Sequence, residues 1–149
     1  MTLETLAAIE DIRRLKARYF RFMDTKDWAG WRTVFTDDAT MLVDTAVSTR
    51  GEDGKPMPLV TGGDAIIAYV RAIIDAAITV HHGHMPEIEI LSSESARGIW
   101  AMRDIVQRPG GPTNRGYGHY YETYRRSPDK GWQIATLHLK RIRRESYAA

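Results

Sequence analysis

The chain has 149 residues, of which 43% are hydrophobic and 27% charged, and its formal net charge is +2. These proportions are typical of one globular domain, residues 1–149, that can bury a core without disulfides. The absence of cysteine excludes a disulfide scaffold, a Cys-ligated zinc site and thiol catalysis. No apolar run approaches the roughly 20 residues of a membrane span, and the first residues lack a signal-peptide pattern. We therefore expect a cytoplasmic protein without a membrane partner.

Three helices are predicted in chain order. Apolar residues recur at steps of three and four over residues 3–23, which predicts an amphipathic helix. Asp27 can cap a second, shorter helix over residues 28–35. A third helix is predicted from residue 64 to about residue 77. The basic residues of the first helix are expected mostly on its other faces: Arg13, Arg14, Lys16 and Arg18.

The rest of the regular structure is predicted to be a sheet. A short strand is expected over residues 39–43, followed by a long loop over residues 44–63, which hold four glycines and two prolines. Four further candidate strands, joined by short turns, are 79–91, 96–107, 115–126 and 131–143. Sequential strands with short turns form an antiparallel meander, and helices that precede a sheet make the fold class α+β.

Basic residues gather in the segment 140–144, Lys-Arg-Ile-Arg-Arg. On a strand these charges alternate between the two faces, which is typical of a solvated edge or a subunit contact. The small net charge also argues against a broad basic footprint. We therefore expect no nucleic-acid partner.

Besides the histidines, three polar residues are candidates for a catalytic or binding role. Tyr19 lies on the apolar stripe of the first helix, so its hydroxyl points inward, as either a satisfied core group or a functional one. Asp24 is five residues further on, about 140° away around the helix, and is either a turn residue or part of a site. Asp104 shares a strand face with Trp100 and Met102. A carboxylate there must be paired, protonated or at a solvated edge, and desolvation would suit it to proton transfer.

A histidine cluster, His81-His82-Gly-His84, begins one of the predicted strands. Strict alternation puts His82 and His84 on one face and His81 on the other, and two ligands make a poor metal site, so we expect no metal. A bulge around Gly83 or Pro86 would reverse the relation of these histidines to the apolar face. Alternation therefore leaves the inward histidine open.

Several short runs resemble a known family in their order and spacing. They are Arg18-Tyr-Phe-Arg-Phe-Met-Asp24, Val34-Phe-Thr-Asp-Asp-Ala39, Thr79-Val-His81, Ala96-Arg-Gly-Ile-Trp100 with Asp104, and Gly118-His-Tyr120 with Gly131-Trp132. Together they cover nearly the whole chain. They resemble the SnoaL-like part of the NTF2-like superfamily, and within it the branch of scytalone dehydratase and bile acid 7α-dehydratase.

The resemblance implies a fold and a set of site residues. The fold is an NTF2-like cone, in which a curved antiparallel sheet wraps on N-terminal helices around an apolar cavity. The catalytic residues implied are His81, Asp24, Tyr19 and Asp104, which selects His81 over His82 and His84. The substrate-binding positions implied are Met41, Trp100, Met102, Tyr120 and Leu137. Homodimers or homotrimers through the outer sheet face are also implied, where Tyr117, His119 and Tyr121 share one side.

The resemblance also implies a function, that of a cofactor-independent dehydratase, a carbon–oxygen lyase acting on a small hydrophobic, ring-bearing molecule. His81 would act as general base, Asp24 would fix its tautomer, and Tyr19 would stabilise negative charge on oxygen. Asp104, if protonated, would help the hydroxyl group to leave. The alternatives are a ketosteroid-type isomerase, a polyketide cyclase, or a non-catalytic ligand-binding protein on the same fold.

Overall fold

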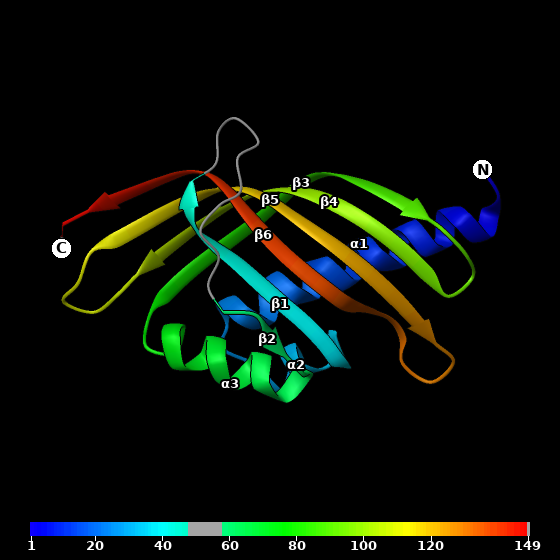
Figure 1. The fold of residues 1–149 in the computed structure, drawn as a ribbon, viewed down its shortest axis with the longest axis horizontal. Coiled ribbons are helices and arrows are strands. Elements are labelled where there is room, and N and C mark those ends of the chain that lie inside the picture. The colour runs from blue at the N-terminus through cyan, green and yellow to red at the C-terminus, as the bar shows by residue number, and fades with distance from the viewer. Residues whose placement is uncertain (48–57, 149) are drawn as a thin grey trace.

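The structure is a computed structural model that describes residues 1–47 and 58–148. Within these residues it contains three helices and one six-stranded sheet (Figure 1). The helices are α1 (Leu3–Asp24), α2 (Trp28–Arg32) and α3 (Gly63–Ile74). The strands are β1 (Phe35–Val47), β2 (Val60–Thr61), β3 (Ile78–Ile90), β4 (Ser95–Gln107), β5 (Thr113–Ser127) and β6 (Gly131–Tyr147). None of the helices in the described ranges is long and apolar enough to cross a membrane.

The strand order of the sheet is β2-β1-β6-β5-β4-β3. Strands β3 to β6 pair in sequence and antiparallel, as the meander predicted, whereas β1 crosses over to pair parallel with β6. The curved sheet arches over α1, and α3 lies beside β1 and β2 (Figure 1). The predicted α+β class and the cone are confirmed.

Two predicted boundaries are wrong near the start of the sheet. The second helix ends at Arg32 rather than at residue 35, and β1 spans Phe35–Val47 rather than residues 39–43. The predicted loop over 44–63 therefore loses its ends to β1 and β2, while residues 48–57 lie outside the described residues. The extra strand length depends on pairing with β6, almost a hundred positions away in the chain, which local sequence patterns do not encode.

The apolar stripe of α1 packs against the concave face of the sheet. Ile12, Leu15, Tyr19 and Met23 are each at most 3% exposed. The expectation for Lys16 is wrong, because its side chain is fully buried. Its ammonium group forms an ion pair with the buried carboxylate of Glu122 on β5. The ammonium also lies 3.7 Å from the ring centroids of both Tyr19 and Tyr120, so one α1 cation contacts a carboxylate and two aromatic rings in the core.

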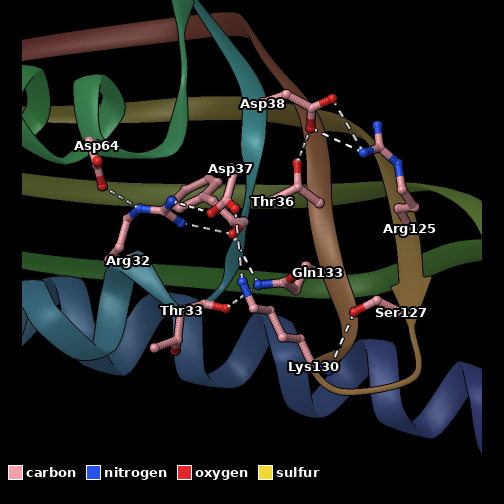
Figure 2. A network of polar contacts seen from close by, with 11 residues as sticks. Arg32, Thr33, Thr36, Asp37, Asp38, Asp64, Arg125, Ser127, Lys130 and Gln133 are labelled. Carbon is pink, nitrogen blue, oxygen red and sulfur yellow. Dashed lines mark hydrogen bonds and ion pairs between the residues drawn. The ribbon is translucent and has the colours of Figure 1, made fainter.

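A polar network fixes α3 to the start of β1 (Figure 2). Arg32, at the end of α2, donates from Nε to Asp64 in the first turn of α3 at 2.7 Å and from Nη2 to Asp37 on β1 at 2.6 Å. The side-chain amide of Gln133 on β6 donates to the carbonyls of Thr33 and Phe35. These contacts hold α3 over the edge of the sheet, where it forms one wall of the cavity described below.

The Lys16–Glu122 pair gives the first testable prediction. Replacing one member of a buried ion pair leaves the other charge uncompensated, which typically costs about 3–5 kcal/mol. We expect Lys16→Met to lower the free energy of unfolding by that amount, measured by urea denaturation. The double variant Lys16→Met/Glu122→Gln should recover most of the loss, because no charge then stays buried. Equal stability of Lys16→Met and the unsubstituted protein would contradict the buried pair.

Candidate active site

A cavity of about 200 Å³ lies between the concave face of the sheet, the end of α1 and α3. Its apolar wall includes Met23 from α1, Met41 and Val43 from β1, Ile74 from α3, and Leu137 from β6. Polar side chains enter it from β3, β4 and β6. A cavity of this kind, mostly apolar with a few convergent polar groups, is the usual form of a small-molecule site.

The carboxylate of Asp24 and the ring of His81 form the central polar pair of this cavity. Nδ1 of His81 lies 2.6 Å from Oδ1 of Asp24, and the backbone N–H of His81 donates to Oδ2 at 2.8 Å. The His81 side chain is only 8% exposed. Since a carboxylate accepts, Nδ1 is the donor, and in the neutral tautomer with this hydrogen bond the lone pair is on Nε2. The pair thus presents an imidazole whose basic nitrogen is Nε2.

Two other side chains hold Asp24 in place. Asp24 is the last residue of α1, where the helix dipole disfavours a negative charge. The hydroxyl of Thr79 donates to Oδ1 of Asp24 at 3.0 Å, and Nζ of Lys26 donates to the same hydroxyl at 2.8 Å. Burial lowers the pKa of Lys26, and the charge of Asp24 opposes this shift. Thr79, itself held by Lys26, therefore orients the carboxylate toward His81.

A β-bulge decides which histidine faces the cavity. On β3, His84 pairs with Ala101 and Glu87 with Ile99, so Met85 and Pro86 together oppose Trp100. Met85 has a φ of 38°, in the left-handed region that such bulges use. The extra residue shifts the alternation, so that His81 shares the inner side with Ile88 and Ile90. His82 and His84 are exposed on the other face.

Three aromatic side chains line the cavity near its inner end. Tyr19 and Tyr120 are 3% and 2% exposed, with ring centroids 5.9 Å apart. Burial raises the pKa of both hydroxyls, so both stay protonated and can donate hydrogen bonds. Trp31 is fully buried, and its indole N–H has no hydrogen-bond partner among the described residues. Tyr19, Tyr120 and Trp31 all belong to the residues that line the cavity.

Asp104 forms an ion pair with Arg141. Arg141 on β6 donates to its two carboxylate oxygens at 3.0 and 3.3 Å, and both side chains are largely buried. Gly116 on the intervening strand β5 makes room for this ion pair, because a Cβ at that position would collide with both side chains. The expected role of Asp104 as a protonated acid stays a prediction, and the structure adds that Arg141 compensates the charge of its carboxylate.

The structure groups most of the residues expected at the site. Tyr19, His81, Asp104, Met41, Tyr120 and Leu137 all line the cavity, and Asp24 holds His81 from behind. Trp100 instead lines a separate hollow beneath α1, formed with Phe20 and Gly83, and its indole N–H donates to Tyr124. Met102 is buried but does not line the cavity. Both departures follow from α1, which covers this part of β4.

Sequence reasoning missed Arg141, Trp31 and the α3 wall. Arg141 was interpreted as part of a solvated charged edge, yet the alternation Leu137, Leu139, Arg141 on β6 already put it on the inner face. Trp31 lies on a helix too short to show a period. The α3 residues that line the cavity could not be identified from the sequence, because they reach the cavity only through the long-range packing of that helix.

The buried tyrosines give a prediction for alkaline pH. Burial raises the pKa of Tyr19, Tyr120 and Tyr124 above the unfolded value of about 10. Their neutral forms therefore contribute stability that is fully present below about pH 10 and is lost as the pH rises further. In a titration of phenolate absorbance, three of the seven tyrosines should ionise only as the circular dichroism signal of the fold is lost. Ionisation of all seven in the folded protein would contradict this burial.

The fold and cavity define a class of protein: an α+β cone with a histidine–aspartate pair on the wall of an apolar cavity. Residues 4–138 match the family model of the SnoaL-like domain. The chain belongs to this family, as the sequence resemblance implied.

Three known proteins illustrate the similarity. "Probable cyclase FGR4" of Gibberella zeae is 26% identical over 137 residues, which cover 88% of this chain and 89% of that protein. A Novosphingobium aromaticivorans protein named for scytalone dehydratase aligns with a TM-score of 0.80 at 20% identity, covering 100% of this chain and 93% of that one. The hexachlorocyclohexane dehydrochlorinase LinA-type3 of Novosphingobium barchaimii aligns with a TM-score of 0.79 at 18% identity, covering 99% and 94%. At these identities the two structures show a shared fold.

Proposed function

We propose that the protein is a cofactor-independent lyase that removes water from a small, mostly apolar, ring-bearing molecule. The observation that carries the proposal is the His81–Asp24 pair on the cavity wall, at 2.6 Å. An imidazole oriented by a carboxylate in an apolar surrounding is a general base suited to a proton made acidic by a neighbouring carbonyl. The names of the relatives, a cyclase and a dehydrochlorinase among them, are compatible with proton-transfer chemistry.

The proposed reaction is an elimination. Nε2 of His81 takes a proton from the carbon next to the carbonyl, and Asp24 stabilises the imidazolium that forms. Tyr19 donates a hydrogen bond to the carbonyl oxygen as negative charge develops there. The carbon–oxygen bond to the hydroxyl then breaks, a carbon–carbon double bond forms, and the imidazolium returns its proton to the leaving oxygen as water.

The Asp104–Arg141 pair takes a different role from the one expected for Asp104 alone. The guanidinium of Arg141 lines the cavity, and Asp104 holds it there. In the proposal this cation stabilises the departing oxygen electrostatically, and Asp104 is a positioning residue. The protonation of the leaving group comes from His81.

A cyclase is the second candidate, because the same base could start a carbon–carbon bond formation and the Gibberella zeae relative bears that name. Isomerisation uses the same base as well. The mass of the product separates these reactions from dehydration, since only dehydration loses one water. A non-catalytic binding protein would leave the mass of every candidate unchanged.

The proposal is tested by assaying dehydration over a panel of β-hydroxy ketones built on steroid, terpenoid and aromatic polyketide rings. We expect His81→Ala to lower kcat by about 10²–10⁴-fold, the usual contribution of a general base. Asp24→Asn should lower kcat less, because the base remains but loses its fixed tautomer. His84→Ala, an exposed histidine on the same strand, is the control and should keep full activity. Undiminished turnover in both site variants would remove the pair from the mechanism.

We also propose that the outer face of the sheet forms a contact between copies of the chain, as a homodimer or homotrimer. His119 and Tyr121 form an aromatic pair on this face, with centroids 6.5 Å apart, and Tyr121 is 40% exposed. Light scattering after size exclusion should give two or three times the mass of 16.9 kDa. Tyr121→Glu should shift the protein to the monomer mass, whereas a monomer before substitution would refute the contact.

A further inference from the structure

A fully buried cation contacts two tyrosines of the cavity wall. The ammonium group of Lys16 on α1 lies 3.7 Å from the ring centroids of both Tyr19 and Tyr120. Both tyrosines line the cavity. Burial lowers the pKa of Lys16 to about 8, and the charge of Glu122 opposes this shift, so the ammonium group is charged at neutral pH. A charge that is shielded from the cavity by two rings can act on a bound molecule through those rings.

A buried network fixes the position of this cation. The carboxylate of Glu122 on β5 pairs with the ammonium group of Lys16. The hydroxyl of Tyr124 donates to the other oxygen of Glu122, and the indole N–H of Trp100 on β4 donates to that hydroxyl at 2.9 Å. All four side chains belong to residues that are at most 6% exposed. The ammonium group is therefore held against the rings and cannot turn toward solvent.

The hydroxyl of Tyr19 responds to charges in the core. Burial raises its pKa most strongly, and the charge of Glu122 raises it further. The same charge would oppose an oxyanion on a molecule that accepts a hydrogen bond from this hydroxyl, because attraction and repulsion are weakly screened in apolar surroundings. Lys16 compensates Glu122 and also contacts the ring of Tyr19.

A cation against the face of a phenol ring is attracted by the electrons of that ring. The attraction grows when the hydroxyl shares its proton with an anion, because the ring then holds more negative charge. The contact with Lys16 therefore favours hydrogen bonds from Tyr19 to an oxyanion over hydrogen bonds to a neutral oxygen.

From this geometry we infer that the hydroxyl of Tyr19 forms an oxyanion subsite in the cavity, and that Lys16 is a positioning residue that strengthens this subsite through the rings of Tyr19 and Tyr120. The ligands that fit it are planar oxyanions, the enolate of a ketone or a phenolate. For the enolate the inference rests on the proposed function, in which His81 removes the proton, whereas binding of a phenolate requires no turnover. An ion pair with a structural role alone would give no preference for an oxyanion.

The test uses two probes of the same size, 4-nitrophenol, which ionises, and 4-nitrotoluene, which does not. The phenolate absorbs at longer wavelength than the phenol, so the absorbance of the bound probe gives its pKa. We expect binding to lower the pKa of 4-nitrophenol by about one, a preference of about tenfold for the phenolate. The affinity for 4-nitrotoluene, from calorimetry, reports on the shape of the cavity. An unchanged or raised pKa of the bound probe, or absence of 4-nitrophenol binding, would overturn the inference.

Variants separate the charge of Lys16 from its packing. Lys16→Met should abolish the preference for the phenolate. Because this variant loses stability, Lys16→Met/Glu122→Gln repeats the measurement without a buried charge. It should also abolish the preference, since the cation is the charge in contact with the rings, and should leave the affinity for 4-nitrotoluene unchanged. A phenolate preference that persists in the double variant would overturn the inference.

The matched control is Arg14→Met/Glu10→Gln, which removes an exposed ion pair from the same helix. It should keep the tenfold preference, and an equal loss in this control would overturn the inference. Tyr19→Phe should abolish the preference, because it removes the donor itself.

His81→Ala distinguishes the subsite from the proposed function, because it should lose lyase activity and keep the preference for the phenolate. If no ketone of the panel is dehydrated, the phenolate measurement still decides the subsite. On a ketone that is dehydrated, Lys16→Met/Glu122→Gln should lower kcat by about tenfold with little change in KM, as expected for a charge that acts on the transition state. An unchanged kcat would contradict the role of Lys16 in the reaction.

Discussion

The site depends on one hydrogen bond, between Nδ1 of His81 and the carboxylate of Asp24. It joins the last residue of α1 to the fourth residue of β3, so it ties the helix to the sheet and also sets the tautomer of the ring. A carboxylate at a helix C-terminus is disfavoured by the dipole, and three donors from β3 offset this: the ring, the backbone N–H of His81 and the hydroxyl of Thr79. These three hydrogen bonds compensate the carboxylate at a position that the helix dipole makes unfavourable.

Two β-bulges distribute the polar groups of the cavity. The bulge at Met85 and Pro86 puts His81 on the inner face, and the bulge at Ile142 puts Arg141 and Arg144 there. Without the first bulge, strict alternation would put His81 and Ile88 on opposite faces of the sheet. Without the second, it would put Arg141 and Arg144 on opposite faces. Gly116 contributes by lacking a side chain, which leaves the space through which Arg141 reaches Asp104. The polar part of the cavity wall thus depends on two bulges and a glycine in an otherwise regular sheet.

Two of the buried ion pairs among the described residues differ in their surroundings. Lys16 and Glu122 form an ion pair in the core, and the rings of Tyr19 and Tyr120 contact the ammonium group of Lys16. Asp104 and Arg141 lie at the cavity itself and can act on a bound molecule. The rings of Tyr19 and Tyr120 contact the first pair and also line the cavity, whereas the second pair lines the cavity itself.

Much of the fold could be predicted from the sequence, because helices and strands follow local periods. The 3.6-residue stripe of α1 and the four strands with short turns needed no tertiary information, and a short set of motifs indicated His81 and Asp24. The parallel pairing of β1 with β6 could not be predicted, since it joins segments almost a hundred positions apart.

Packing alone decided the remaining features. The burial of Lys16 depends on Glu122 arriving from β5, and the ion pair of Asp104 depends on Arg141 arriving from β6. The face that His81 presents depends on one extra residue in its strand. A sequence pattern records which residue types alternate, but whether a charge is compensated depends on contacts between distant segments, which only the folded chain brings together.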